Sequence, residues 1–374
     1  MFLGFHATIA EIDLEALMHN YRTLRQLLAP SVKVLAVVKA DAYGHGAVPV
    51  SRRLEELGVD FLGVATVQEG VEIRQAGVQS PIIILSGVYP EEMGDVLHYE
   101  LTPMLFRLET AEILSAEAKK IEKTIPVHLK VDTGMGRIGV HYQDVTGFVT
   151  TLRNYENLKI EGVASHFATA DEEDASFVEE QLQRFSWSVE QLGKIGVTPT
   201  YCHVANSAAL FRQPAAHFNV VRPGIMLYGS YPSPLFREKI SLRAVMSWKS
   251  RVADLKSVPA GFPISYGRTY VADRASRIAA IPVGYADGYS RLLSNRGEVL
   301  IKGRRAAVVG RVCMDWTMVD VTQIPDVGVG DEVVLLGRQM DEAITAEELS
   351  ERIGTIPYEV LCSVGKRVPR IYRG

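Results

Sequence analysis

The chain has 374 residues, of which 47% are hydrophobic and 22% charged, a composition typical of a folded globular protein. Its 40 lysines and arginines against 44 aspartates and glutamates leave a net charge of −4 without a basic block, which argues against a nucleic-acid partner. The length exceeds the size at which one hydrophobic core usually stops growing, so we expect one large domain and a smaller one.

The sequence shows no targeting signal and no cysteine spacing that predicts disulfides or a metal site. The N-terminus MFLGFHATIAEID has no basic segment followed by a long apolar stretch, and no run of about 18 apolar residues occurs, so we expect no membrane partner. The three cysteines, Cys202, Cys313 and Cys362, cannot all pair, and none stands in a CxxC spacing. A reducing, cytoplasmic location and no metal site are therefore expected.

Through the first 230 residues, short apolar runs rich in Val and Ile alternate with amphipathic stretches, such as 14–29, 67–77 and 172–196, that predict helices. The apolar runs predict eight strands, at 32–40, 60–66, 81–87, 101–106, 126–134, 159–166, 201–207 and 219–229. Strands this continuously apolar favour a parallel sheet covered by helices, and eight of them match a closed (β/α)8 TIM barrel. An open doubly wound sheet is the alternative, but no GxGxxG follows the first strand.

After about residue 240 the pattern changes to short alternating or apolar runs broken by Gly, Pro, Asn and Asp, which predicts a mostly-β domain. The segment YPSPLFREKI, at 231–240, carries two prolines near the boundary. We therefore expect an α/β barrel domain over 12–240 and a C-terminal β domain over 241–374, to which residues 1–11 are added. The segment HATIAEID, at 6–13, could be an edge strand of that second domain.

Polar residues stand at or just after the ends of the predicted strands. Lys39, Lys130, His166, His203 and Arg222 all do so. In a TIM barrel the C-terminal strand ends form the face that carries the active site, and the loops after strands seven and eight commonly bind phosphate. Those loops supply a hydroxyl at Ser207 and an unhindered amide at Gly224. A phosphorylated ligand held there, with a lysine reaching over from strand one, fits a pyridoxal phosphate enzyme.

Eight segments carry a resemblance to a known family. AVVKADAYGHG, LKVDTGMGRIG, VANSAA, VRPGIMLYG, SYGRTY, PVGYADGY, GRVCMDWTMVD and IPYEVLC follow one another along the chain. In that order they resemble the bacterial alanine racemases. The resemblance implies a pyridoxal 5'-phosphate-dependent isomerase that interconverts L-alanine and D-alanine and supplies D-alanine for peptidoglycan. It also implies a head-to-tail homodimer whose active sites lie between the barrel of one subunit and the β domain of the other.

Carried over position by position, the resemblance implies a role for each matching residue. Lys39 would bind the cofactor aldehyde and act as one catalytic base, and Tyr266 of the partner subunit would be the other. Tyr43, Ser207, Tyr358 and the amides of Gly224 and Ile225 would hold the phosphate. Arg222 would face the pyridine nitrogen, Arg137 the phenolic oxygen and the substrate carboxylate, Met314 of the partner that same carboxylate, and Tyr285 the entrance. Lys130 corresponds to a lysine that is carbamylated in characterised members.

Racemisation needs two bases on opposite faces of a planar carbanion. Lysine and tyrosine have unperturbed pKa values near 10.4 and 10, so the pKa of each must be lowered before it can act as a base near neutral pH. Burial can lower the pKa of Lys39, and a chain from Tyr266 through His166 to Arg222 could favour the phenolate. Arginine can only donate to the pyridine nitrogen, which would keep that nitrogen unprotonated and restrain side reactions.

Simpler interpretations and rival functions stay open. Cys313 has no nearby His–Asp arrangement and is interpreted as structural, and His203 and Asn206 as supports of Arg222. A decarboxylase of the same architecture would place a carboxylate at the pyridine nitrogen, where VRPG supplies an arginine. A racemase acting on serine or other amino acids cannot be separated from one acting on alanine. A non-catalytic cofactor binder would leave the second domain without a site to complete.

Overall fold

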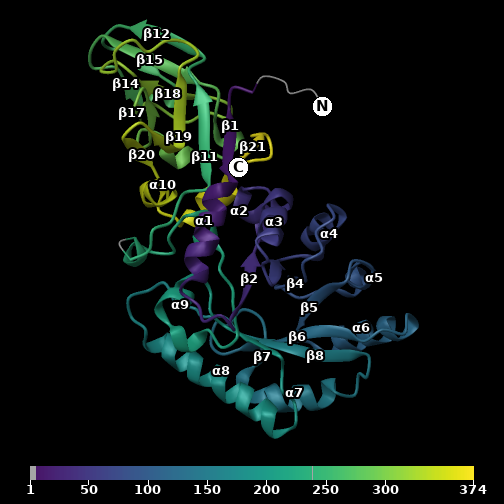
Figure 1. Ribbon diagram of the computed structural model, residues 1–374. Helices are drawn as coiled ribbons and strands as arrows, with labels where there is room; N and C mark the ends of the chain where they lie inside the picture. The colour runs from purple at the N-terminus through teal and green to yellow at the C-terminus, as the bar shows by residue number, and fades with distance from the viewer. Residues whose placement is uncertain (1–5, 238) are drawn as a thin grey trace.

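The computed structural model describes residues 6–237 and 239–374, and it shows a barrel domain below a mostly-β domain (Figure 1). Eight parallel strands follow the order β10-β2-β3-β4-β5-β6-β8-β9, so each strand lies beside its sequence neighbours and β10 returns to β2. The strands are β2 (Lys33–Val37), β3 (Phe61–Val64), β4 (Ile82–Ile84), β5 (Leu101–Leu105), β6 (Ile125–Asp132), β8 (Leu158–Ala164), β9 (Tyr201–His203) and β10 (Val220–Val221). The predicted eight-stranded barrel is confirmed.

The barrel closes between β9 and β10 through loops rather than a strand ladder. The Arg222 N–H donates to the Ala205 carbonyl over 2.9 Å, just beyond the ends of these two strands. A short extra strand, β7 (Val140–His141), pairs with β6. The barrel is therefore nearly closed, and this closing contact lies at the face where the strands end.

Helices cover the outside of the barrel (Figure 1). The three that the sequence predicts appear as α1 (Leu14–Arg25), α4 (Val67–Gln75) and α8 (Ser176–Lys194). Each is amphipathic, and α4 begins at a capping box in which Thr66 and Glu69 satisfy each other's backbone N–H groups. The other helices of this domain are α2 (Lys39–Gly44), α3 (Ala47–Glu56), α5 (Met93–His98), α6 (Leu108–Lys120), α7 (Val145–Leu152) and α9 (Ser207–Arg212). None of the helices in the described ranges is long and apolar enough to cross a membrane.

The second domain is built on a largely antiparallel sheet in the order β12-β15-β18-β17-β16-β19-β11-β1-β21, with β20 paired to β19. Its strands are β1 (Ile9–Asp13), β11 (Met246–Arg251), β12 (Asp254–Val258), β15 (Ser276–Ile281), β16 (Glu298–Ile301), β17 (Arg304–Val308), β18 (Thr317–Asp320), β19 (Glu332–Gln339), β20 (Glu342–Ile344) and β21 (Arg370–Arg373). A separate hairpin, β13 (Pro263–Ile264) and β14 (Tyr270–Val271), and two helices, α10 (Ala346–Ile353) and α11 (Pro357–Ser363), complete it.

The N-terminal segment joins this second sheet, but not at its edge. β1 lies between β11 and β21, antiparallel to the first and parallel to the second. The prediction of an edge strand was therefore wrong, because the C-terminal residues of the chain add one more strand outside β1. The expectation for residues 1–5 lies outside the described part of the chain.

One hydrophobic core runs through both domains. It joins barrel residues such as Leu35 and Ile83 to C-terminal residues such as Trp248 and Leu361. Helix α11 packs against α2 at the mouth of the barrel. The last helix of the second domain therefore forms part of the wall around the barrel's C-terminal face.

Candidate active site

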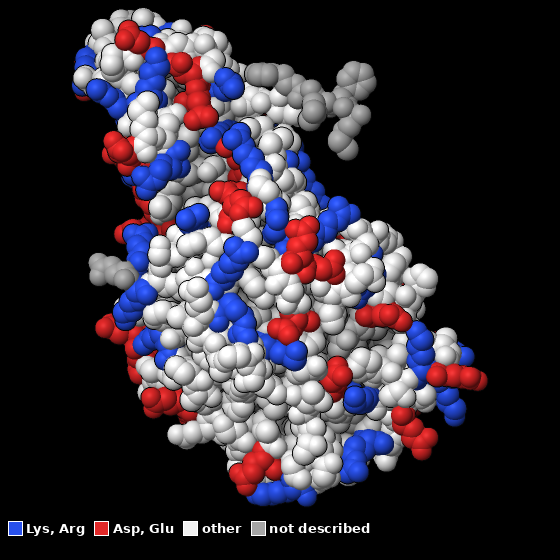
Figure 2. Space-filling model, viewed as in Figure 1, with Lys and Arg blue, Asp and Glu red and all other residues white. Residues whose placement is uncertain are grey.

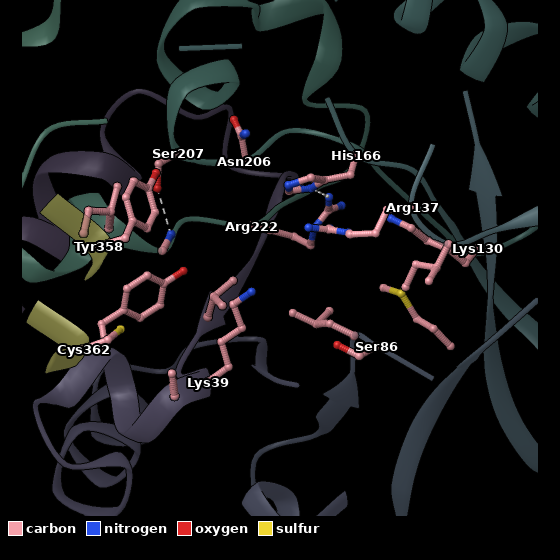
Figure 3. A pocket seen from close by; sticks show the side chains of 18 residues that line it. Lys39, Ser86, Lys130, Arg137, His166, Asn206, Ser207, Arg222, Tyr358 and Cys362 are labelled. Atoms are coloured by element: carbon pink, nitrogen blue, oxygen red, sulfur yellow. Dashed lines mark hydrogen bonds between the residues drawn. The ribbon is translucent and has the colours of Figure 1, made fainter. Parts of the chain in front are cut away.

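A cavity of about 490 Å³ opens at the C-terminal face of the barrel (Figure 3). Ten of the residues predicted from the sequence line it: Lys39, Tyr43, Lys130, Arg137, His166, Ser207, Arg222, Gly224, Ile225 and Tyr358. They come from five strand ends or the loops after them, and from α11. The structure thus brings together residues spread over more than 300 positions of the chain.

Lys39 follows β2 and begins an unusual turn. Ala40, Asp41, Ala42 and Tyr43 all adopt left-handed helical angles, with φ between 52° and 55°. For residues with a side chain this conformation costs roughly 1–2 kcal/mol each, so neighbours must hold it in place. Hydrogen bonds do so: the Ala47 N–H donates to the Asp41 carboxylate (2.7 Å), and Arg370 donates to the Gly44 carbonyl (3.0 Å). The turn places Lys39 and Tyr43 on the same cavity wall.

Four basic side chains, Lys39, Lys130, Arg137 and Arg222, line the cavity, and no aspartate or glutamate lies among its described lining residues. Burial and the nearby Arg137 lower the pKa of the Lys39 amine. Burial, Arg222 and Arg137 hold the pKa of Lys130 far below its usual value. A cavity this positive favours an anionic ligand, because a bound anion would offset the repulsion among these groups.

Arg222 is held by the barrel itself. Its guanidinium donates to the carbonyls of Ser165 (2.7 Å), His203 (2.8 Å) and Val204 (3.2 Å). It also bonds the Nδ1 atoms of His203 (2.9 Å) and His166 (3.1 Å). Burial and Arg137 lower the pKa of Arg222 to about 10, so it remains charged at neutral pH. The prediction that His203 supports Arg222 agrees with these contacts.

Because an arginine only donates, His203 must accept at Nδ1 and carry its proton on Nε2. That Nε2 lies 2.8 Å from Nδ1 of His128, one layer deeper in the barrel. Burial and Arg222 lower the pKa of His203 well below its usual value and that of His128 to about 4. Both rings therefore stay neutral, and Arg222 keeps its positive charge beside them.

The opposite end of the cavity is rich in hydroxyl and amide groups. Tyr43 lies between Tyr228 and Tyr358, with ring centroids 4.8 and 5.9 Å away. Burial raises the pKa of both Tyr43 and Tyr358, so each keeps its proton and can donate it in a hydrogen bond. The Gly224 N–H bonds the Ser207 hydroxyl over 2.8 Å. A Cβ at Gly224 would lie 2.5 Å from the Tyr43 hydroxyl, so only glycine permits this approach.

Tyr266, Tyr285 and Met314 do not line the cavity of their own chain. All three belong to the second domain: Met314 follows Cys313, the Tyr285 N–H donates to the Cys313 carbonyl (3.0 Å), and the hydroxyl of Ser265, which precedes Tyr266, lies 3.5 Å from the Cys313 sulfur. Their exposed fractions are 71% for Tyr266, 43% for Tyr285 and 53% for Met314. We call these three residues the exposed face of the C-terminal domain.

Comparison with known proteins then decides the family. The family "Alanine racemase, N-terminal domain" matches residues 12–232, and "Alanine racemase, C-terminal domain" matches residues 245–372. An alanine racemase of Citrifermentans bemidjiense is 50% identical, over 98% of this chain and 99% of its own. The chain belongs to the alanine racemase family.

Solved structures of the family agree. An alanine racemase of Clostridium difficile 630 superimposes with a TM-score of 0.94 at 40% identity, covering 99% of this chain and 96% of the other. A Bartonella henselae alanine racemase, described with covalently bound pyridoxal phosphate, has a TM-score of 0.88 at 33% identity, covering 99% and 100% of the two chains. The fold of this chain is thus that of the family, and the family is one of isomerases.

Seven lining residues were not singled out from the sequence as part of the site: Val37, Ala40, Leu85, Ser86, Met104, Ile138 and Cys362. Ser86 follows β4 just as Lys39 follows β2, so the rule of strand ends could have found it. Cys362 lies four residues after Tyr358 on α11, a spacing that places both on one helix face. Asn206 lines the cavity, but its side chain accepts from the Ala209 N–H (3.0 Å) and caps α9, so its predicted support of Arg222 was wrong.

Proposed function

We propose that this chain is a pyridoxal 5'-phosphate-dependent racemase of alanine. The observation that carries the proposal is the cavity itself, in which Lys39 lies among basic side chains, with hydroxyl and amide donors at one end and Arg222 between that end and Lys130 (Figure 3). This donor set fits a ligand that has an aldehyde, a phosphate and a ring nitrogen. When bound, pyridoxal phosphate acidifies the α-proton of an amino acid by accepting its electron pair.

The residues of the cavity divide among the parts of that cofactor. The hydroxyls of Tyr43, Ser207 and Tyr358, with the amides of Gly224 and Ile225, would hold the phosphate. Arg222 would donate to the ring nitrogen, and because it stays charged at neutral pH, it would keep that nitrogen unprotonated. Its neighbour His166 would line the same side of the cofactor.

Proton transfer requires a base on each face of the substrate α-carbon. Lys39 supplies one, since burial lowers the pKa of its amine and so favours the neutral form. Tyr266 of the partner subunit supplies the other, while the partner's Met314 amide and Arg137 of the first chain hold the substrate carboxylate. The partner's Tyr285 lies at the entrance. The support for this assignment is that the exposed face of the C-terminal domain is separate from the cavity of its own chain.

The same separation supports a homodimer. A two-fold arrangement that brings each exposed face to the other subunit's cavity would complete two equivalent sites. Charges of both signs are interspersed over the face of the molecule seen in Figure 2, which offers no broad basic surface for a nucleic acid there. The proposed partners are therefore the amino-acid substrate and a second copy of this chain.

Lys130 is proposed to carry a carbamate. Its amine is buried beside Arg222 and Arg137, and its pKa lies far below the usual value, so the neutral form that attacks carbon dioxide is favoured. The amine nitrogen would bond to the carbon of carbon dioxide and lose one proton, leaving an anionic carbamate. That anion would compensate the neighbouring arginines and orient Arg137.

The setting of the enzyme is also part of the proposal. We divide the chain into a cofactor-binding barrel over 12–240 and a C-terminal domain over 241–374 and 1–11, and place it in the cytoplasm, where it would supply D-alanine for peptidoglycan. The three cysteines are all unpaired, which fits a reducing compartment.

One experiment separates this proposal from its rivals. The purified protein is examined for the visible absorbance of lysine-bound pyridoxal phosphate, and L-alanine, L-serine and L-lysine are then followed in parallel by chiral chromatography. We expect a yellow protein that converts L-alanine to a racemic mixture faster than L-serine. A colourless protein, or release of carbon dioxide with an amine product, would contradict the proposal. Faster turnover of serine would show a racemase of another substrate.

A further inference from the structure

The left-handed turn directly after Lys39 is hydrogen-bonded to a residue outside the turn. Within the turn, the Ala42 N–H donates to the Val38 carbonyl (2.8 Å), and the Gly46 N–H donates to the Asp41 carbonyl (2.9 Å). The Ala40 N–H instead donates to Oε1 of Glu69, over 2.7 Å. Ala40 is the first left-handed residue and the one directly after Lys39. The contact with Glu69 therefore lies at the point where the turn leaves the lysine.

The second carboxylate oxygen of Glu69 accepts hydrogen bonds from a different segment of the chain. Its Oε2 accepts from the Ala65 N–H (2.6 Å) and from the Thr66 N–H (3.3 Å), where β3 ends and α4 begins. Ala40 and Glu69 are 29 residues apart in the chain. One carboxylate thus ties the turn after β2 to the neighbouring strand end and to the first turn of α4.

We propose that Glu69 is a positioning residue for the Lys39 amine: its carboxylate bridges the strained turn after Lys39 to the start of α4. This inference rests on the proposed function, in which Lys39 binds the cofactor and moves a proton. A base that drifts from its productive position by a fraction of an ångström loses rate, so the anchor of a strained turn next to that base affects catalysis directly. Glu69 itself does not line the cavity.

The charge of Glu69 acts on Lys39 as well. Burial and Arg137 lower the pKa of the Lys39 amine, and the Glu69 carboxylate opposes them. Removing that charge therefore moves the pKa of Lys39 further down. This charge effect gives a readout at Lys39 that does not depend on the stability of α4.

The alternative is that Glu69 serves α4 alone. Its backbone N–H donates to the Thr66 hydroxyl over 3.3 Å, which completes the capping box. Thr66→Ala removes that half of the box and leaves the carboxylate free to bridge. Glu72→Gln makes the same chemical change as Glu69→Gln one turn further along α4, at an exposed side chain. These two variants are the matched controls.

The test compares three substitutions at Glu69 with the two controls. Glu69→Gln removes the charge, and its amide keeps only one oxygen to accept from backbone N–H groups. Glu69→Asp keeps the charge but is one methylene shorter, so it does not reach both Ala40 and Ala65. Glu69→Ala removes both the charge and all hydrogen bonds to the carboxylate. Thermal unfolding is recorded for each, and if Glu69→Ala does not fold, the other two carry the test.

The first measurement needs no turnover. The pH dependence of Lys39 labelling by an amine reagent is followed by peptide mass spectrometry in the cofactor-free full chain. We expect the labelling midpoint to move to lower pH in Glu69→Gln and to stay unchanged in Glu69→Asp, Thr66→Ala and Glu72→Gln. An unchanged midpoint in Glu69→Gln would contradict the electrostatic part of the inference.

The second measurement uses the holoenzyme. We expect kcat/KM to fall about tenfold in both Glu69→Gln and Glu69→Asp, because each loses a hydrogen bond from a backbone N–H to the charged carboxylate. The α-deuterium isotope effect should rise only for the alanine enantiomer whose proton Lys39 removes. Thr66→Ala should lower the melting temperature and leave both quantities within twofold of the parent chain.

Two results would overturn the inference: Glu69→Gln and Glu69→Asp behaving like Glu72→Gln, or Thr66→Ala reproducing their effects. Failure of the proposed function looks different. In that case the parent chain itself neither binds pyridoxal phosphate nor racemises alanine, while the labelling experiment still reports whether Glu69 acts on Lys39.

Discussion

Sharing of the active site between two subunits makes a quantitative prediction. Lys39 lines the cavity, and Tyr266 is 71% exposed on the other domain of its own chain. Lys39→Ala and Tyr266→Phe should each abolish racemisation. Tyr266→Phe removes one hydroxyl from an exposed side chain, so we expect it to fold normally.

Mixing these two inactive chains should restore activity. After free exchange, about half of the dimers are mixed, by random pairing of a two-fold dimer. In each mixed dimer one site keeps both Lys39 and Tyr266, and the other site has lost both. About one quarter of all sites, and so about one quarter of the parent activity, should return.

A second mixture sharpens the test. Equal amounts of the parent chain and the chain carrying both substitutions should give about one quarter of full activity if sites are shared, and about one half if each chain holds a complete site. Activity is measured as D-alanine formed from L-alanine with a coupled D-amino-acid oxidase, and native mass spectrometry counts the mixed dimers. Mixed dimers without recovered activity in the first mixture, or one-half activity in the second, would refute the reasoning.

Three further predictions concern the cavity and its surroundings. Gly224→Ala places a Cβ 2.5 Å from the Tyr43 hydroxyl, so we expect about tenfold weaker binding of pyridoxal phosphate, measured by fluorescence titration of the cofactor-free chain. If Lys130 carries a carbamate, isotope-labelled bicarbonate should give a carbamate signal in the NMR spectrum that Lys130→Arg lacks, and activity should fall in buffers stripped of carbon dioxide. His45 is fully buried and its pKa is lowered to about 4 from 6.5, so the unfolded chain binds the extra proton first as pH falls. Stability should fall as pH decreases from 6.5 toward 4, and His45 should account for up to about 3 kcal/mol of that loss, beside the contributions of the other buried neutral histidines, as urea unfolding would show. His45→Asn, which can still donate to the Ala42 carbonyl, should make that dependence less steep by the share of one histidine, and an equally steep dependence in His45→Asn would assign it to other groups.

The barrel was predictable because its strands are short and buried on both faces, so each is a nearly unbroken apolar run. The site followed from the same pattern. In a parallel barrel all strands end at one face, and polar residues at those ends are therefore neighbours whatever their distance in the chain. Lys39, Lys130, His166 and Arg222 meet in one cavity for this reason.

The roles of individual residues were less accessible to the sequence. Asn206 stands beside Ser207 in the same loop, yet it caps α9, since a side chain after a strand can turn toward the backbone as readily as toward the cavity. Ser86 follows a strand end and was accessible by that rule, but a single serine or cysteine such as Cys362 indicates no particular role in a site. The sequence predicts an edge strand at residues 6–13 because no local signal shows that Arg370–Arg373 will pair beside β1.

By itself, then, the sequence of this protein determined the family, the two-domain architecture and the strand ends at which the site is built, since these depend on local pattern and on motifs. Only the tertiary structure decided the left-handed turn after Lys39 and the carboxylate that anchors it. Nothing in Ala-Asp-Ala-Tyr favours positive φ, and such a conformation persists only where contacts from distant segments, here Glu69 and Arg370, offset its cost. The tertiary structure also decided that Tyr266 lies away from Lys39 within one chain, because this separation depends on how the two domains are placed and not on either motif.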